Sequence, residues 1–528
     1  MNVSYLQWMY CTYASAFDMI QSDSGDLKNT FIERGTGVMR TRTINMTEGS
    51  ILKSLIAFAV PILIGNIFQQ LYNVADTAII GNLLGDNALA AVGAAAPVYQ
   101  LLIGLALGLT NGFAVIIARF FGAGDSDGLT SSVSLTYILS GIASVILTVL
   151  GVIGLHPLMV WLKTPESILA DTEEYMMIII LFSVTTIAYN MLAGMLRAIG
   201  NSRAPLYFLI LSTFINVGLD FLFVGSFGMG VAGAAYATVI SQGISVILCF
   251  IYVVKRCDVV LFRKSGLKKD RRLLSDLIST GLSMGMMNAI VSIGSVILQG
   301  AVNGFGTVTI TAHSAARKID DIFMLPLGTM AMSASTFASQ NFGAGKIDRV
   351  KKGIRYGILM ASAWSAFSVV VAVVFSRPLV HFLTGTSDKM VLETSARYIA
   401  WNISFFVVLG VLLILRSSLQ GVGRKLVPVT GSIVEFVLKI VAVLILAPWL
   451  GYFGICILEP IIWMVCAGIV VMDYRAFLKK CRTSMIYDTL TPGIEEIKFN
   501  FCRRNVVKNV VKWTPLYKGS PESRDSGL

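Results

Sequence analysis

Charged residues are scarce in this 528-residue chain. They make up 14% of it, whereas an ordinary soluble protein carries about 25%. Hydrophobic residues make up 55%, and the mean hydropathy is +0.74. So few polar side chains cannot cover the surface of a soluble protein of this size, and the composition therefore indicates an integral membrane protein.

The sequence also lacks the motifs of enzymes and structural metal sites. It has no GxxxxGK[ST] loop or HExxH, its three histidines are widely separated, and its seven cysteines include no CxxC pair. We therefore expect no ATP site, no catalytic site, no structural metal and no disulfide framework. An embedded enzyme or receptor would need a catalytic cluster or a large extramembrane domain, and neither is visible.

Apolar runs long enough to cross a membrane occur twelve times. A hydrocarbon core of roughly 30 Å needs about 20 helical residues. The runs lie at about 54–80, 88–118, 129–155, 174–199, 204–224, 231–254, 276–302, 308–338, 354–376, 391–419, 426–447 and 453–474. The expected fold class is all-α integral membrane with twelve transmembrane helices.

The distribution of Lys and Arg predicts the orientation. The segments after even-numbered runs hold 19 basic residues and those after odd-numbered runs hold 3. We expect a multi-pass protein of the cytoplasmic membrane. Because basic loops stay on the cytoplasmic side, both termini are expected in the cytoplasm. The net charge of +12 then reflects topology and a basic tail, and nucleic acid is not an expected partner.

The second half of the chain repeats the first. ARFFGAGDSDGL at 118–129 recurs as SQNFGAGKIDRV at 339–350, AIGNSRAPL at 198–206 as GVGRKLVPV at 421–429, and LIAFAVP at 55–61 as LISTGLS at 277–283. Six helices are an even number, so the second half enters the membrane in the same orientation. Two six-helix bundles related by a pseudo-two-fold axis along the membrane normal are therefore predicted.

The repeat divides the chain into five predicted parts. These are an N-terminal cytoplasmic tail (1–50), an N-terminal six-helix bundle (51–254), a basic cytoplasmic linker (255–275), a C-terminal six-helix bundle (276–474) and a C-terminal cytoplasmic tail (475–528). The basic run CRRNVVKNVVKW at 502–513 suits either anionic membrane lipid or solvent. A monomer would suffice, because one chain contains both halves.

Polar residues at membrane depth are the candidate functional residues. In the first run, Gln69, Asn73 and Asp76 share one helix face, and in the fifth run Asn216 and Asp220 lie one turn apart. Asn190 and Thr238 add neutral oxygens from the fourth and sixth runs. Two carboxylates with amide and hydroxyl oxygens suit a hard monovalent cation or a shared proton. Alternatively, Asn190 and Thr238 would form hydrogen bonds to neighbouring helices, and the sequence favours neither role over the other.

These motifs resemble the multidrug and toxin extrusion (MATE) transporters. The resemblance covers about residues 48–475 and rests on the twelve-helix duplication, QQLYNVADTAIIGNLLG, FGAG, MLRAIGNSRAP and NVGLD. It favours the bacterial and archaeal branch with its cation site in the N-terminal bundle. It assigns Asp76, Asp220, Asn216, Thr238 and Asn190 to that site. It also assigns Pro61 to a bend that responds to the cation, whereas the sequence alone marks only a kink.

The second half departs from the acid pattern of other MATE proteins. Its first run has no acid beyond Asp276 at its mouth, so a cation site there is not expected. It carries Arg317, Lys318, Asp320, Asp321, Glu435, Lys439 and Glu459 instead. Glu435 can pair with Lys439 at i, i+4, and the charges at 317–321 can neutralise one another. Alternatively, Glu435 and Glu459 face the cavity between the bundles.

The resemblance implies a secondary antiporter that exports amphipathic, cationic drugs or toxins by alternating access. The coupling ion would be H⁺ or Na⁺, with no other cofactor. Candidate residues of the substrate cavity are Gln69, Asn73, Glu435, Glu459 and Arg317. The alternative is a lipid-linked oligosaccharide flippase of the same wider superfamily, which would need a strongly cationic cavity.

Overall fold

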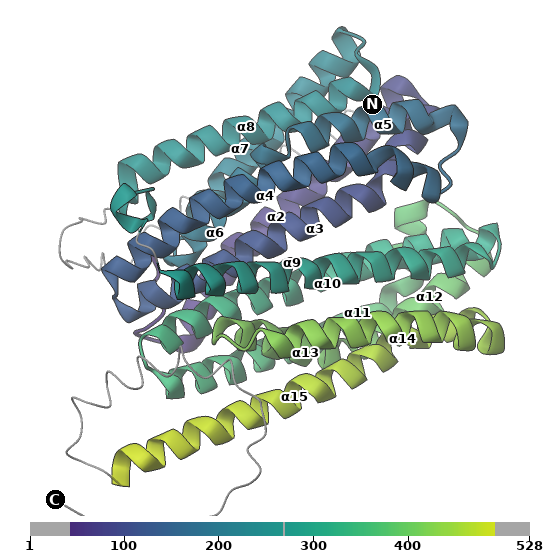
Figure 1. Cartoon of the computed structure of the whole chain (residues 1–528). Helices are drawn as coiled ribbons and strands as arrows, with labels where there is room; N and C mark the ends of the chain where they lie inside the picture. Colours follow the sequence, from purple (N-terminus) through teal and green to yellow (C-terminus); the bar gives the residue numbers. More distant parts are fainter. Residues whose placement is uncertain (1–42, 268–269, 491–528) are drawn as a thin grey trace, which may run out of the picture.

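The computed structural model describes residues 43–267 and 270–490, and within these ranges long helices dominate. The first half forms α2 (Ile51–Leu84), α3 (Asp86–Ala123), α4 (Ser126–Trp161), α5 (Glu166–Leu181), α6 (Ser183–Ala198), α7 (Arg203–Asp220), the π-helix η1 (Phe221–Ser226) and α8 (Gly230–Arg256). The second half forms α9 (Arg271–Asn303), α10 (Thr307–Gly343), α11 (Ile347–Thr384), α12 (Lys389–Ser404), α13 (Phe406–Gly421), α14 (Leu426–Leu450) and α15 (Tyr452–Leu490). Figure 1 shows the two halves as stacked helical bundles with α3, α9 and α10 between them.

The twelve predicted spans are present, but two of them are broken. Ten helices are long and apolar enough to cross a membrane, and two bent pairs complete the set. The pairs α5–α6 and α12–α13 bend by 48° and 47°. They break at Phe182 and Phe405, which lie 223 residues apart. The single helices predicted for 174–199 and 391–419 are therefore wrong.

A neighbouring helix stabilises the first break. The Thr148 hydroxyl of α4 donates to the Ile180 carbonyl at 3.3 Å and lies 2.9 Å from the Ser183 hydroxyl. These bonds satisfy backbone and side-chain groups where the helix is interrupted. Neither break contains Gly or Pro, so neither left a signal in the sequence.

The structure shifts some predicted boundaries. Helix α15 continues to Leu490, beyond the expected end at 474. The linker between α8 and α9 covers 257–270 rather than 255–275, and it is docked on α4. There the Ser134 hydroxyl donates to the Arg263 carbonyl at 2.9 Å and accepts from the Arg263 amide at 3.1 Å. The run at 502–513 lies outside the described residues.

The repeat is also present in the backbone. Four pairs of glycines adopt nearly the same positive φ: Gly85 and Gly306 (86° and 86°), Gly124 and Gly345 (66° and 73°), Gly200 and Gly423 (89° and 90°), Gly230 and Gly451 (61° and 60°). An L side chain rarely adopts this conformation. Equivalent turns in the two halves are therefore built by equivalent glycines, as the repeated motifs predicted.

The two bundles cross closely at the FGAG motifs. A Cβ on Gly122 of α3 would overlap the Gln340 carbonyl of α10, and a Cβ on Gly343 would overlap the Arg119 carbonyl. Arg119 and Gln340 are themselves equivalent, 221 residues apart. This reciprocal contact places the pseudo-two-fold axis between α3 and α10. We call the end of the molecule that holds this crossing the basic end, because the linker at 257–270 lies there.

A second close contact joins α3 to α9. Positions for a Cβ on Gly108 and Gly112 are filled by the α9 backbone around Gly285 and Gly281. Both helices thus carry glycines four residues apart at the interface. Such small residues allow helices to approach closely in a membrane, where van der Waals contact replaces the hydrophobic effect.

Residues 43–50 bridge the bundles at the basic end. The Ile44 amide donates to the Gly200 carbonyl of the first half at 3.1 Å. Met46 is fully buried, and its carbonyl accepts from Asn341 at 2.9 Å and Arg349 at 3.1 Å, both of the second half. The end of the predicted N-terminal tail is therefore part of the folded structure.

We expect Gly122→Val to lower the melting temperature of the purified protein. The new side chain must push α3 away from the α10 backbone, and such overpacking costs roughly 1–3 kcal/mol or more. Gly141→Val in α4 is the control, because a Cβ there meets nothing within 4 Å. Equal melting temperatures for the two variants would contradict the close crossing.

We expect Arg349→Ala to release residues 43–50. Besides Met46, the Arg349 guanidinium donates to the Glu48 and Gly49 carbonyls at 3.0 and 2.9 Å, and hydrogen bonds to charged groups are worth roughly 1.5–3 kcal/mol each. Hydrogen exchange at the Ile44 amide should accelerate, whereas the exposed Arg355→Ala on the same helix should leave it unchanged. Unaltered exchange in Arg349→Ala would show that other contacts hold the segment.

Candidate functional site

The two predicted acids of the first half meet inside the N-terminal bundle. Asp76 lies in the C-terminal half of α2 and is 7% exposed, while Asp220 is the last residue of α7 and is fully buried. Their carboxyl groups are close enough to interact directly. Two carboxylates so close repel one another unless a proton or a cation neutralises the pair.

The carboxyl pair has few other partners. Both Asp220 carboxyl oxygens and Oδ1 of Asp76 accept no hydrogen bond from another described residue, and neither do the two amide atoms of Asn216 find a partner. Asn216 is 1% exposed and lies one turn before Asp220 on α7. Buried polar atoms are normally paired. Such a group of unsatisfied oxygens fits a small cation or proton.

Thr238 and Asn190 relate differently to this pair. Thr238 of α8 is 2% exposed, and its hydroxyl lies 3.0 Å from the Tyr72 hydroxyl of α2. Asn190 of α6 is half-buried and donates to the Thr186 carbonyl of its own helix at 2.9 Å. Thr238 thus links helices around the acids, whereas Asn190 makes no hydrogen bond to them among the described residues.

Three tyrosines near the acids were not singled out in the sequence. Tyr72, Tyr99 of α3 and Tyr175 of α5 all lie close to Asp76. Tyr72 precedes Asp76 by four residues and could have been found from helix periodicity. Tyr99 and Tyr175 arrive from other helices, so no local pattern marks them.

The backbone changes form directly after Asp220. Helix α7 ends at this residue, and the π-helix η1 follows at Phe221–Ser226. Short π-helical segments occur mostly within α-helices and often at functional sites. The widened turn sets the position of Asp220 at the junction of two helix geometries.

Other predicted residues of α2 lie apart from the buried pair. Gln69 and Asn73 are exposed, and Asn73 donates to the Gln70 side chain at 3.4 Å. Pro61 is buried within α2, which continues through it as one helix. A cavity role for Gln69 and Asn73 and a bend at Pro61 stay predictions.

The charges of the second half form a separate, paired cluster. Lys439 lies 3.2 Å from Glu435 of its own helix α14 and 3.4 Å from Glu459 of α15. Arg416 of α13 lies 3.7 Å from Glu435. Glu435 and Glu459 are 7% and 6% exposed. The pairing of Glu435 with Lys439 is as predicted, and a contact of either acid with substrate stays a prediction.

Helix α10 adds its own charges to this cluster. Arg317 lies 3.7 Å from Asp321 and donates to the Tyr398 hydroxyl at 3.5 Å, so the predicted pairing within 317–321 is present for these two. Asp320 is fully buried, and neither of its carboxyl oxygens has a hydrogen-bond partner among the described residues. The Arg317 guanidinium is thus engaged, which does not favour a free cationic cavity for a pyrophosphate.

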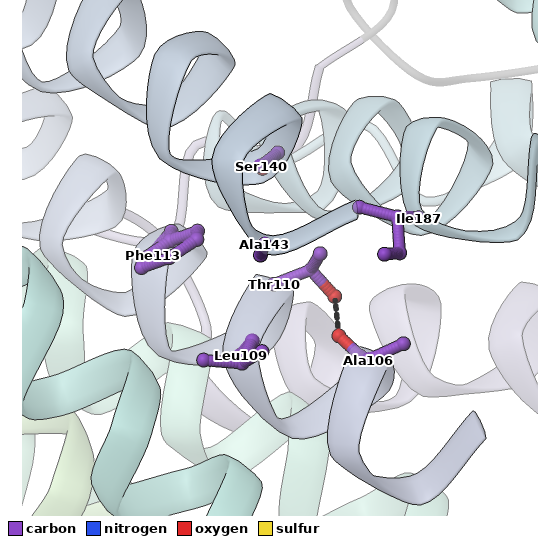
Figure 2. Close-up of a pocket in the computed structure, with 7 residues that line it drawn as sticks. All are labelled: Ala106, Leu109, Thr110, Phe113, Ser140, Ala143 and Ile187. Carbon is purple, nitrogen blue, oxygen red and sulfur yellow. Dashed lines mark hydrogen bonds between the residues drawn. The ribbon is translucent and has the colours of Figure 1, made fainter. Parts of the chain in front are cut away.

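A small pocket inside the N-terminal bundle does not resemble a substrate site. Figure 2 shows its lining from α3, α4 and α6: Ala106, Leu109, Thr110, Phe113, Ser140, Ala143 and Ile187. The Thr110 hydroxyl is turned to the Ala106 carbonyl at 2.9 Å (Figure 2). The pocket leaves no room for even one water molecule, so it is a gap in helix packing.

Two comparisons with known sequences agree on one family. The MatE family model matches residues 61–222 and again 284–445. The probable multidrug resistance protein YpnP of Bacillus subtilis (strain 168) is 28% identical over 415 residues, covering 78% of this chain and 92% of its own. The multidrug export protein MepA of Staphylococcus aureus (strain NCTC 8325 / PS 47) is 24% identical over 389 residues, covering 71% and 83%.

Solved structures share the fold. A multidrug resistance MATE family transporter of the MOP superfamily, solved in an outward-facing conformation, superposes with a TM-score of 0.77 at 23% identity over 84% of this chain and 99% of its own. The crystal structure of MATE in the bent conformation gives a TM-score of 0.78 at 23% identity over the same shares. The two matches of the family model start 223 residues apart, in agreement with the repeat. The chain therefore belongs to the MatE family of multidrug and toxin extrusion transporters, twelve-helix membrane proteins built from two bundles.

Proposed function

We propose that the protein is a secondary antiporter that exports amphipathic, cationic organic compounds in exchange for H⁺ or Na⁺. The observation that carries the proposal is the Asp76–Asp220 pair, which is buried in the N-terminal bundle and has no basic partner within residues 43–267 and 270–490. Ionisable residues at membrane depth are costly and mark ion pathways in transporters. Drugs or toxins are the expected substrates, because the names of YpnP and MepA associate those relatives with multidrug resistance and export.

The ion would act by shifting an equilibrium between two arrangements of the bundles. In the described arrangement the bundles touch at the basic end, through the Gly122 and Gly343 crossing and residues 43–50. With the basic end in the cytoplasm, this arrangement is closed to the cytoplasm. The cation can favour one state only by as much as its affinity differs between the two states.

The remaining parts of the proposal concern location and assembly. The excess of basic residues at the basic end supports a cytoplasmic membrane protein with both termini inside. Membrane lipid is then its surroundings, and a single chain supplies both bundles. Pro61 would supply the bend in α2 that follows cation binding, since it lies on the same helix as Asp76.

We expect Asp76→Asn and Asp220→Asn each to reduce ethidium efflux to the background of cells that lack their own pumps. Either change removes one carboxylate from the pair, so the site would no longer bind the cation that shifts the equilibrium between the two states. Asp86→Asn, an exposed acid at the start of α3, is the control and should export normally. Export by both site variants at the rate of the unaltered protein, with equal expression, would refute a coupling role.

We expect only one of two imposed ion gradients to drive export. Vesicles loaded with ethidium would be given a pH gradient or a Na⁺ gradient in separate experiments, with the membrane potential clamped. Export driven by only one gradient identifies the coupling ion. Asn216→Ala should raise the ion concentration needed for half-maximal export roughly 10-fold, because a hydrogen bond to a charged group is worth about 1.5 kcal/mol. Export that ignores both gradients would exclude secondary antiport.

A further inference from the structure

The repeat assigns each residue of the proposed ion site a counterpart in the second half. In the first half α7 packs against α2 and α8, and in the second half α14 packs against α9 and α15. Pro205 of α7 corresponds to Pro428 of α14, 223 residues later. With this register, Asn216 corresponds to Lys439, since they are also 223 residues apart.

The last helix of each half has a slightly different register. Gly233 of α8 packs against Phe223, and Gly454 of α15 packs against Leu446. Phe223 and Leu446 are again 223 residues apart, while the two glycines are 221 apart. Offsets of 221 residues along α8 and α15 make Glu459 the counterpart of Thr238.

The counterpart of the ion site therefore has a different chemistry. Asp220 corresponds to Val443, and the residues 222 and 223 positions after Asp76 are Leu298 and Gln299. No acid occupies the positions of the carboxyl pair. Instead, the carboxylates of Glu435 and Glu459 lie on either side of the Lys439 ammonium.

The second half makes room for this lysine. A Cβ on Gly294 of α9 would lie only 3.0 Å from Cδ of Lys439 and 3.8 Å from its Nζ. Lys439 is 2% exposed, and its ammonium has three donors for the two carboxylates. Arg416 approaches Glu435 from α13, and Arg317 and His313 approach Glu459 from α10. An ammonium so deeply buried is tolerable only because these acids pair with it.

We propose that Lys439 is a tethered cation that fills the C-terminal counterpart of the ion site. Its ammonium pairs with two buried carboxylates, as an exchangeable ion would between Asp76 and Asp220, and Arg416 supplies a second positive charge beside Glu435. At these two equivalent positions, exchangeable cation binding is thereby confined to the N-terminal bundle. The claim that only the N-terminal bundle couples to an ion rests on the proposed function, but the claim that Lys439 fills the second site does not.

The test measures cation binding by full-length protein in detergent after the first site has been removed. The background is Asp76→Asn/Asp220→Asn, to which Lys439→Met or Lys439→Gln is added. Bound radioactive ²²Na⁺ and proton uptake are measured for each variant that elutes as a folded, monodisperse species. We expect the background variant to bind no Na⁺, and its Lys439 derivatives to gain a single bound Na⁺ or one extra proton relative to that background. Adding Glu435→Gln and Glu459→Gln should abolish the regained binding.

The opposite results would overturn the proposal. A folded Lys439 derivative that takes up neither ion shows that the acids do not form a cation site. If the background variant binds Na⁺ and Glu459→Gln abolishes that binding, Lys439 does not block the site. This comparison does not require any Lys439 variant to fold. If the unaltered protein binds no cation, the antiporter proposal fails, whereas the Lys439 derivatives still decide the present one.

Discussion

A carboxylate inside a bilayer must be compensated, and both bundles are arranged around this constraint. In the N-terminal bundle, Asp76 and Asp220 have no basic partner among the described residues, so the proposed compensation is an ion from outside the protein. In the C-terminal bundle, Glu435 and Glu459 are compensated by Lys439. The choice between an exchangeable and a resident cation separates a site that can respond to an ion gradient from one that cannot.

The duplicated backbone contrasts with this asymmetry of side chains. Glycines with matching φ angles form equivalent turns in the two halves, and the bent helix pairs differ by only 1° in their bends. The crossing of Gly122 and Gly343 involves backbone on both sides. Such a contact constrains the backbone and leaves the side chains of each bundle free to differ. The fold therefore preserves its symmetry, although the acid pair of the described N-terminal bundle has no basic partner and Glu435 and Glu459 of the other bundle do.

Much of this architecture could be predicted from the sequence, because length, hydropathy and repeated motifs are local properties. The twelve spans and the duplication needed no tertiary information, and the spacing of Asn216 and Asp220 placed both on one helix face. The breaks at Phe182 and Phe405 were missed because no Gly or Pro marks them. Arg416, counted with the basic loops, lies within α13, where Glu435 at 3.7 Å offsets the cost of burying its charge.

The candidate site shows the same division. Asp76 and Asp220 were paired by chemistry alone, and the structure brings them together. Tyr99 and Tyr175 join them only through the packing of α3 against α2 and of α5 against α3 and α8. In the second half, the i, i+4 spacing gave the Glu435 to Lys439 pair, whereas the partnership of Lys439 with Glu459 depends on the docking of α15 against α14, which no local pattern encodes.

The carboxyl pair also has an electrical consequence. If Asp76 and Asp220 hold one monovalent ion, exchange of that ion for a singly charged cationic compound moves no net charge across the membrane. The membrane potential, worth about 2.3 kcal/mol per charge per 100 mV, would then contribute nothing, and the concentration gradient of the ion would supply all the driving force. A neutral compound exported by the same cycle would let one charge move inward. The potential would therefore drive the export of neutral compounds and be indifferent to monovalent cationic ones.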